Sequence, residues 1–325
     1  MSIMFGLFNE PSLGYDYTTL EKFALEAEKY SYDSYWVSDH LLFFRKFPYR
    51  NCLDSWTILA ALANKTTKIK LGTLVTCNSF RYPSILAKQA SSIDMISNGR
   101  LFFGYGAGWN REEYESYGIP FPSGLVRLEQ MEEAIRLIKL LWTEEKVTFK
   151  GKYYQLKDCV FAPKPVQKPY PPIMIGGDGP KVTLKLVAKY ADYCNLFHNK
   201  NLEWKIDALK QHCKDVGRDY DSLGKSLFAG WPGIVFTSTE EEKEYFYRKR
   251  SKYIGIDYKT VKSWYSLEAP GSWIGFPEEI RERFEYLISL GLDYFQVQFH
   301  PADDLKEKKI MESVQIFKEK VVNKI

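Results

Sequence analysis

The sequence LFFGYGAGWNREEYESYGIPFP at residues 101–122 changes from a strand pattern to a glycine-rich pattern and then to a helical one. Residues 101–103 are strand formers, and glycine then stands at positions 104, 106 and 108. Alternate glycines bare one face of a strand, so that either a flat ligand or a neighbouring element can approach the backbone closely. Trp109 and Asn110 follow where the strand should end, and they supply an apolar wall and a polar amide. The stretch predicts a buried strand that ends in a candidate binding site.

On both sides of this stretch, strand and helix patterns alternate along the chain. Eight strands, each followed by a helix and with no linker-like break in composition, predict one (β/α)8 TIM-type barrel over residues 1–325. The alternative, a doubly wound sheet, needs a reversal of strand order that the sequence does not locate. The other predicted strands span 3–8, 34–37, 69–77, 173–175, 193–198, 226–237 and 294–299, and the main helices 17–32, 54–63, 83–96, 127–145, 181–191, 202–216, 277–290 and 303–322.

Several segments depart from this regular alternation. Residues 147–156 predict a small β hairpin inserted after the fourth helix, and the proline-rich connector 163–172 excludes regular structure. The seventh strand is interrupted at 230–233, and residues 252–276 predict an irregular insertion after it. The aromatic residues of this insertion and of loop 43–49 predict either a cover over the site or a subunit interface.

The composition excludes several classes of function. A net charge of +4, spread along the helices, does not provide the concentrated basic patch that nucleic-acid binding requires. No stretch approaches the roughly 18 apolar residues of a membrane span, and the first residues lack a signal-peptide pattern, so we expect a cytoplasmic protein. The five cysteines lie far apart without a CxxC pair, which indicates neither a disulfide framework nor a zinc site. We therefore expect no metal, no nucleic acid and no membrane partner.

Polar residues gather at the carboxyl ends of the predicted strands, where barrel sites are built. Three of the four histidines lie there, namely His40, His198 and His300, whereas His212 falls within a helix and is predicted to lie on the surface. Strand-end positions also include Asn9, Glu10, Asp39, Thr76, Cys77, Gly106, Ala107, Gly108, Trp109 and Asn110. The concentration of histidines at one rim favours a catalytic site over a purely structural role.

A second glycine motif, Gly176-Gly177-Asp178-Gly179, precedes a predicted helix. Exposed backbone N–H groups and a helix N-terminus form an anion site that suits a phosphate, although a simple glycine turn would give the same pattern. The motif is neither GxGxxG nor a P-loop, and no GxSxG nucleophile elbow occurs in the chain. Together with the glycine-rich strand end, it favours an elongated, phosphate-bearing ligand with a flat ring system.

Four segments of the chain occur in an order that resembles one family: WVSDHLL (36–42), LGTLVTCNSFRYPSILAK (71–88), ISNGRLFFGYGAGWNREEYESYGIPFP (96–122) and PYPPIMIGGDG (169–179). They are similar to the bacterial luciferase-like superfamily, and most similar to its branch of oxidoreductases that depend on the deazaflavin coenzyme F420. The resemblance covers residues 1–200 well and the remainder loosely. Enzymes of the superfamily that use flavin mononucleotide (FMN) share the same barrel.

The resemblance implies a dimeric TIM-type barrel that holds the cofactor ring at its strand ends. His40 would be the catalytic residue that exchanges a proton with the substrate, a role that an ordinary histidine pKa of about 6.5 would suit. Leu74 and Val75 would form a bulge with a non-prolyl cis peptide behind the ring. The implied cofactor contacts are Asp39, Leu74, Val75, Thr76, Cys77, Gly106, Ala107, Gly108, Trp109, Asn110, Gly176, Gly177, Asp178 and Gly179.

Three functions follow from these observations. The leading hypothesis is an oxidoreductase that transfers a hydride between coenzyme F420 and a small organic substrate. The alternatives are an FMN-dependent monooxygenase that uses dioxygen and reduced flavin, and a non-catalytic flavin-binding barrel. Trp109 stands where sugar-phosphate dehydrogenases of the branch carry a catalytic glutamate, which argues against sugar phosphates as substrates. Arg111 and Lys181 are candidate partners for the longer anionic tail of the deazaflavin.

Overall fold

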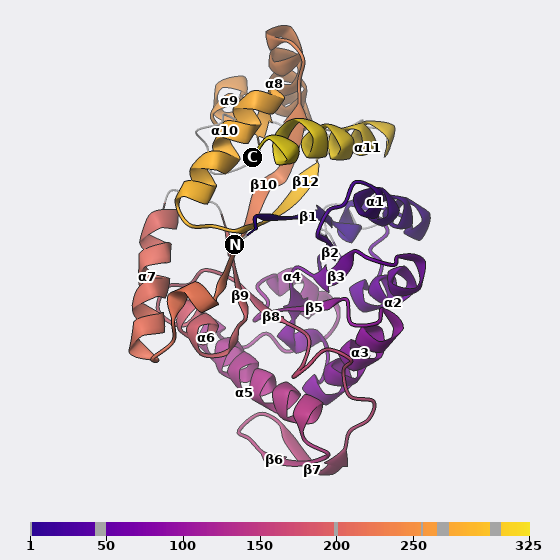
Figure 1. Ribbon diagram of the computed structural model, residues 1–325, viewed down its shortest axis with the longest axis vertical. Helices are drawn as coiled ribbons and strands as arrows, with labels where there is room; N and C mark the ends of the chain where they lie inside the picture. Colours follow the sequence, from indigo (N-terminus) through magenta and orange to yellow (C-terminus); the bar gives the residue numbers. More distant parts are fainter. Residues whose placement is uncertain (1, 43–49, 198–200, 255, 265–272, 300–306) are drawn as a thin grey trace.

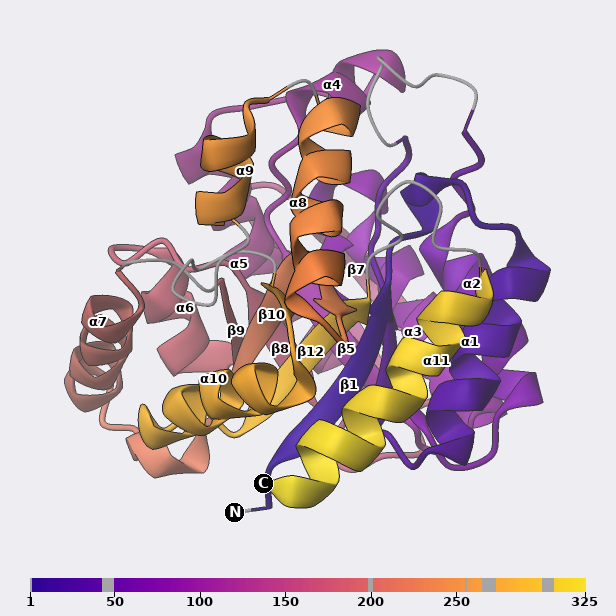
Figure 2. The ribbon, with the colours of Figure 1, turned by 90° about the horizontal axis from the view of Figure 1, so that it is seen from above.

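The computed structural model describes residues 2–42, 50–197, 201–254, 256–264, 273–299 and 307–325. Within these ranges, eight parallel strands follow one another round a barrel in the order β1, β2, β3, β5, β8, β9, β10 and β12, and β12 pairs again with β1. Helices surround the strands on the outside (Figures 1 and 2). The barrel predicted from the alternation is confirmed, and the doubly wound alternative is wrong.

The elements agree closely with the predicted alternation. The strands are β1 Met4–Asn9, β2 Ser34–Val37, β3 Lys70–Thr73, β4 Thr76–Cys77, β5 Leu101–Gly106, β8 Ile173–Gly176, β9 Tyr193–Phe197, β10 Gly224–Phe236 and β12 Tyr294–Phe299. The helices are α1 Tyr17–Lys29, α2 Ser55–Lys65, α3 Pro83–Ile96, α4 Arg111–Ser116, α5 Gly124–Thr143, α6 Thr183–Tyr190, α7 Leu202–Asp215, α8 Glu240–Ile254, α9 Tyr258–Trp264, α10 Pro277–Ser289 and α11 Glu307–Ile316.

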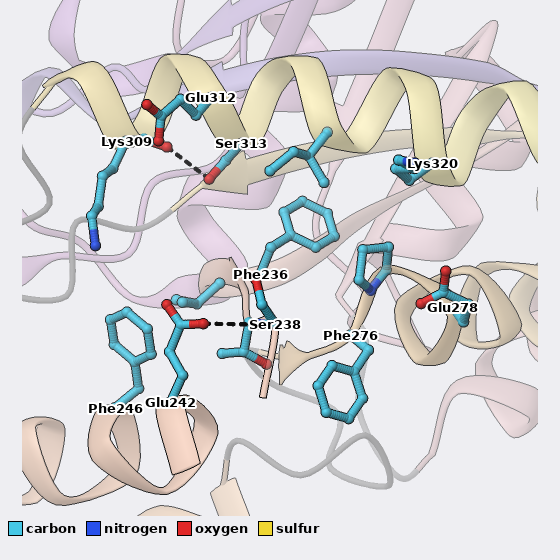
Figure 3. A pocket seen from close by; sticks show the side chains of 14 residues that line it. Phe236, Ser238, Glu242, Phe246, Phe276, Glu278, Lys309, Glu312, Ser313 and Lys320 are labelled. Atoms are coloured by element: carbon cyan, nitrogen blue, oxygen red, sulfur yellow. Dashed lines mark hydrogen bonds between the residues drawn. The ribbon is translucent and has the colours of Figure 1, made fainter. Parts of the chain in front are cut away.

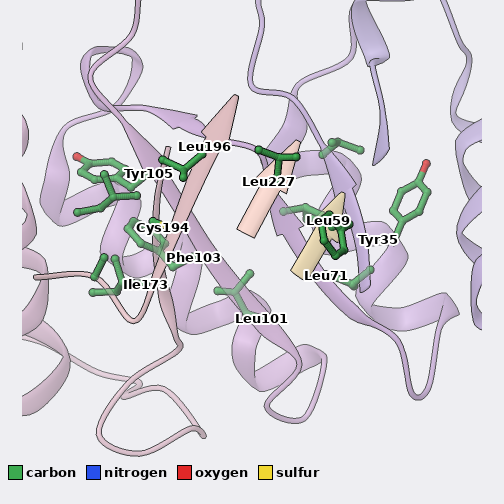
Figure 4. Close-up of a cluster of buried hydrophobic side chains, with 14 of the residues drawn as sticks. Tyr35, Leu59, Leu71, Leu101, Phe103, Tyr105, Ile173, Cys194, Leu196 and Leu227 are labelled. Carbon is green, nitrogen blue, oxygen red and sulfur yellow. The ribbon is translucent and has the colours of Figure 1, made fainter. Parts of the chain in front are cut away.

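Alternation of side chains along each strand builds two cores. On β5, Leu101 and Phe103 point outward to the helices, whereas Phe102 points into the barrel. The outer core is the larger one, and Figure 4 shows part of it between the strands and the surrounding helices. The barrel interior is filled by Phe8, Trp36, Phe102, Met174, Phe228 and Tyr294, so the barrel is a packed core with its open end at the carboxyl ends of the strands.

The predicted third strand, 69–77, is divided in the structure. It forms β3 and β4, and the peptide between Leu74 and Val75 that separates them is cis. β3 pairs with the start of β5, and β4 pairs with its end at Tyr105 and Gly106. The bulge that the resemblance implied at Leu74 and Val75 is therefore present.

The two predicted insertions have different outcomes. The β hairpin is confirmed as the antiparallel pair β6 (Lys146–Lys150) and β7 (Gln155–Val160). The insertion at 252–276 is less irregular than expected, because α8 continues to Ile254 and both α9 and the strand β11 (Trp273–Gly275) lie in it.

The glycines at 230–233 do not end the seventh strand, because β10 continues across them with a shift of register between Ala229 and Ile234. No helix in the described ranges is long and apolar enough to cross a membrane.

Candidate active site

A cavity of about 780 Å³ lies at the carboxyl ends of the barrel strands. All the residues named above as catalytic or cofactor-binding line it, and they come from four segments of the chain: 39–40, 74–77, 106–110 and 176–179. Phe8 and Phe228 from the barrel interior, and the more exposed Phe197 at the end of β9, add further apolar wall. The volume is within the range of about 300–1,000 Å³ that small-molecule and cofactor sites occupy.

His40 is held by a carboxylate that the sequence analysis did not select. Nδ1 of His40 lies 3.0 Å from both Oε1 and Oε2 of Glu113, so that an N–H at this nitrogen donates to the carboxylate. The backbone N–H of Leu41 donates to Oε1 of the same carboxylate at 2.8 Å. The side chain of Glu113 is 2% exposed and that of His40 is 25% exposed, so the histidine is anchored at its buried edge. Nε2 is the ring nitrogen left for exchange with a ligand.

The surroundings of His40 favour its charged form. Burial acts to lower its pKa, but the hydrogen bond that His40 donates to Glu113 and the negative charges of Glu10, Glu113 and Asp39 outweigh it and raise the pKa from 6.5 to about 9. Glu10 is itself 3% exposed and accepts hydrogen bonds from Ser12 and Ser38. The pKa of His40 is therefore raised above the ordinary value expected from the sequence, a shift that favours the imidazolium form as a proton donor.

The bare glycines of β5 accommodate the bulge. A Cβ at Gly106 would lie 2.6 Å from Cγ2 of Val75, and a Cβ at Gly176 would lie 2.8 Å from both methyl groups of Val75. A Cβ at Gly104 would overlap the backbone oxygen of Thr73. The alternate glycines therefore permit close packing by a neighbouring segment, and Gly106 and Gly108 also line the cavity, where their role toward a ligand stays a prediction. Leu74 and Val75 line the cavity, so the bulge itself is presented to a ligand.

Asp39 has its carboxylate engaged within the protein. Nη1 of Arg81 donates to Oδ1 at 3.0 Å and to Oδ2 at 2.8 Å, and the backbone N–H of Cys77 donates to Oδ2 at 3.0 Å. These contacts tie the end of β2 to the end of β4, and Ser55 of α2 donates to the same group. Asp39 lines the cavity. Its observed hydrogen bonds go to Ser55, Cys77 and Arg81, and they hold the segment that carries His40 against α2 and β4.

Trp109 and Asn110 occupy the rim beside His40. The Trp109 ring meets the His40 ring edge to face, with centroids 5.9 Å apart at 84°, and remains 66% exposed. Oδ1 of Asn110 accepts from the backbone N–H of Glu112 and so caps α4, the helix that carries Glu113. Nδ2 of Asn110 is buried and has no hydrogen-bond partner among the described residues, so it is a donor that a ligand in the cavity can satisfy.

The second glycine motif forms the other end of the cavity. Gly176, Gly177, Asp178 and Gly179 line it together with Thr183, the first residue of α6. α6 begins without a side-chain cap, which leaves the positive end of the helix toward this loop. The N–H of Gly177 donates to the carbonyl of Asn195 at 3.2 Å, so this amide does not contribute to an anion site.

The cations proposed for an anionic tail lie elsewhere. Arg111 is 69% exposed and pairs with Glu115, Lys181 is exposed, and neither lines the cavity. Arg127 of α5 lines it instead. Its guanidinium stacks 4.1 Å from the Phe121 ring centroid and donates to the carbonyls of Pro122 and Gly108. These contacts involve Nη1 and Nε, and within the described part of the chain Nη2 has no hydrogen-bond partner.

Sequence reasoning missed Glu113 and Arg127, and it assigned His212 incorrectly. Glu113 was visible only as part of a helical pattern, and Arg127 only as the predicted start of a helix. His212 is partly buried, and its Nε2 lies 2.7 Å from the carbonyl oxygen of Pro180, so it is not a free surface residue. His198, His300 and the aromatic loop 43–49 lie outside the described residues.

A second cavity of about 420 Å³ lies away from these residues, on the flank between α8, α10 and α11 (Figure 3). It is lined by Phe236, Phe246 and Phe276 and by charged side chains of both signs, including Glu242 and Lys309. None of the predicted site residues lines it.

A parallel barrel with a cofactor-sized cavity at its strand ends is the arrangement found in TIM-barrel enzymes. The family model for luciferase-like monooxygenases matches residues 1–294, and the chain belongs to this family. The resemblance stated from the sequence motifs is thereby confirmed.

The chain is similar to proteins with different named cofactors. It is 36% identical over 213 residues to an F420-dependent glucose-6-phosphate dehydrogenase from Kineococcus radiotolerans, a match that covers 64% of this chain. The chain spans 62% of the length of that protein, and 50% of a protein of the same name from Amycolatopsis mediterranei. It is 26% identical over 268 residues to an FMNH2-dependent dimethylsulfone monooxygenase from Pseudomonas putida, over 74% of this chain and 72% of that protein.

A solved F420-dependent secondary alcohol dehydrogenase, in complex with an F420-acetone adduct, has the same fold. The TM-score is 0.79 over 99% of both chains, with 23% sequence identity. At this identity the likeness establishes the barrel and leaves the substrate open.

Proposed function

We propose that this protein is an oxidoreductase that transfers a hydride between coenzyme F420 and a small organic substrate, with His40 exchanging the accompanying proton. The observation that carries the proposal is the contact of His40 Nδ1 with both oxygens of Glu113 at 3.0 Å, at the rim of the strand-end cavity. A purely structural histidine does not require a buried carboxylate that fixes one nitrogen while the other edge faces a cavity. The F420-dependent relatives support the choice of cofactor.

The residues present fit such a cofactor. The unsatisfied Nδ2 of Asn110 and the hydroxyl-bearing Thr183 at the uncapped start of α6 are available to polar groups of a ligand. The bulge at Leu74 and Val75 offers an apolar surface to a ring system, and Arg127 offers a cation to an anionic tail. On these grounds we assign the ring system of the cofactor to the bulge at Leu74 and Val75, and the phosphate of the cofactor to residues 176–179.

When bound, a deazaflavin would give hydride to the substrate or take hydride from it, and the chain would hold the reactants in place and exchange the proton. Glu113 holds the His40 ring by Nδ1 and keeps it charged, so that Nε2 donates a proton when the substrate is reduced. In the reverse direction the same nitrogen accepts the proton. Glu113 is a positioning residue in this account, because it acts through His40.

FMN is the second candidate cofactor, and the monooxygenase similarity over 74% of the chain is the observation that favours it. The same glycine loop would hold the phosphate of either cofactor. A non-catalytic flavin-binding barrel is the third possibility, and it predicts no turnover. A homodimer and a cytoplasmic location remain predictions from the resemblance and the sequence.

The test is a screen of alcohols, aldehydes, ketones and enones with oxidised or reduced F420, followed through the visible absorbance of the oxidised deazaflavin. Once a substrate is found, His40→Gln should lose about 10²–10⁴-fold in kcat while it still binds F420. A His40→Gln variant with full activity would contradict the assigned proton exchange. Dioxygen consumption with reduced FMN, and no turnover with F420, would favour the monooxygenase.

A further inference from the structure

Helix α7 holds the phosphate end of the cavity from outside. Nζ of Lys205 forms an ion pair with Oδ2 of Asp178, and two turns later His212 contacts the carbonyl of Pro180 at 2.7 Å. Lys205 is 9% exposed, and its side chain and that of Asp178 are both largely buried. Asp178 lines the cavity between Gly177 and Gly179.

Asp178 is an unexpected residue at this place. A carboxylate within an anion-binding loop repels a phosphate, and this repulsion is strong where water is excluded. One amide of the loop, that of Gly177, is already bonded to Asn195. The affinity of the loop for an anion therefore depends on a positive charge that offsets Asp178.

We propose that the Lys205–Asp178 pair sets the charge of this loop and that Lys205 determines its affinity for phosphate-bearing cofactors. The proposal deepens the function proposed above and rests on it. Lys205 reaches the loop from α7, and its charge acts on the phosphate through Asp178. The ammonium of Lys205 offsets the negative charge of Asp178, so that the N-terminus of α6 can favour an anion. Loss of Lys205 removes one positive charge beside the carboxylate, so the carboxylate opposes an anionic ligand more strongly.

The alternative is that the ion pair only fastens the loop to α7. The two possibilities predict opposite effects of removing the Asp178 carboxylate on the affinity for a phosphate-bearing ligand. If the pair is a fastener, removing either partner loosens the loop and weakens binding. If the pair sets the charge, removing the carboxylate strengthens phosphate binding and removing the ammonium weakens it.

The experiment compares the wild-type protein with Asp178→Asn, Lys205→Met and the double variant by fluorescence titration. The ligands are F420 and its deazariboflavin core, which lacks both the phosphate and the anionic tail, with FMN and riboflavin as the pair that differs by the phosphate alone. We expect Asp178→Asn to bind F420 about two- to fivefold more tightly and Lys205→Met about tenfold more weakly. The double variant should lie within about twofold of wild type, and the phosphate-free ligands should show no such order.

Weaker F420 binding by both single variants, or binding equal to wild type in both, would overturn the proposal while the cofactor assignment stands. Circular dichroism and thermal unfolding check that each variant is folded, and if Lys205→Met is not, the sign of the Asp178→Asn effect still decides. If the wild-type protein prefers FMN to F420, the F420 assignment has failed. The ion-pair proposal is still supported if Asp178→Asn binds FMN more tightly and Lys205→Met more weakly than wild type, with no such difference for riboflavin. Binding of neither cofactor would overturn both.

Discussion

Glu113 and His40 are 73 residues apart in the chain, yet both carboxylate oxygens of Glu113 lie 3.0 Å from Nδ1 of His40. The helix α4 that carries Glu113 is capped by Asn110 and tied to the His40 segment by a hydrogen bond from the Tyr117 hydroxyl to the carbonyl of Leu41 at 3.0 Å. The glycine-rich strand end and the histidine loop thus form one unit. This unit holds the imidazole of His40 at the rim of the cavity, beside a carboxylate that favours its charged form.

Substitution of Glu113 by Gln should lower the pKa of His40 from about 9 toward 6.5 or below, because burial then outweighs the remaining charges. The pKa can be measured from the imidazole proton resonances of the protein against pH, with His40→Gln to assign the signal. Glu115→Gln is the matched control, since it removes a carboxylate from the same helix that is 51% exposed and pairs with Arg111. An unchanged pKa in Glu113→Gln would contradict the role given to this carboxylate.

The raised pKa also predicts a pH dependence of stability. His40 is more basic in the folded chain than in the unfolded one, so its contribution to the free energy of unfolding is complete below pH 6.5. That contribution is lost as the pH rises through about 9. The difference in unfolding free energy between wild type and His40→Gln should therefore shrink across this interval. Urea denaturation of both proteins at several pH values measures it, and a constant difference would count against the prediction.

Gly104→Ala should destabilise the protein by about 2–3 kcal/mol, because a Cβ there overlaps the backbone oxygen of Thr73 and forces β3 and β5 apart. Gly124→Ala is the control. Its nearest neighbour would be Nη2 of Arg127 at 3.8 Å, so this variant should be neutral or stabilised by up to about 1 kcal/mol. Chemical denaturation compares the two, and equal stabilities would show that the close approach of the strands is not needed.

Asp39→Asn should cost about 3 kcal/mol of stability, since it breaks a buried, two-oxygen contact with Arg81. Asp54 pairs with the same guanidinium but is 42% exposed, and Asn in its place still caps α2. Asp54→Asn should therefore cost less than about 1 kcal/mol. A similar loss in both variants would mean that burial of Asp39 does not distinguish the two ion pairs.

The barrel could be predicted because each strand and helix has its own local pattern, and eight such pairs have few ways to pack. Residues 252–276 were harder, because the helix α9 there is short and its turns carry little periodicity. The continuous strand β10 was predicted as interrupted because glycine and proline at 230–233 usually end a strand. Its register shift accommodates them.

The strand-end position of His40 and of the two glycine motifs followed from the fold, since a barrel brings all its carboxyl ends to one rim. The contacts that these residues make with distant parts of the chain could not be predicted from the fold. Glu113 approaches His40 only through the placement of α4, and the glycines of β5 are explained by Val75 of another segment. Long-range contacts of this kind have no local signal in a single sequence.

Titration of the purified protein with F420 and, separately, with FMN, followed by ligand fluorescence, tests the central claim most directly. The account predicts a dissociation constant for F420 of about 1 μM or lower, with FMN at least about tenfold weaker. Tighter binding of FMN than of F420 would contradict hydride transfer through the deazaflavin and direct the search to dioxygen-dependent chemistry.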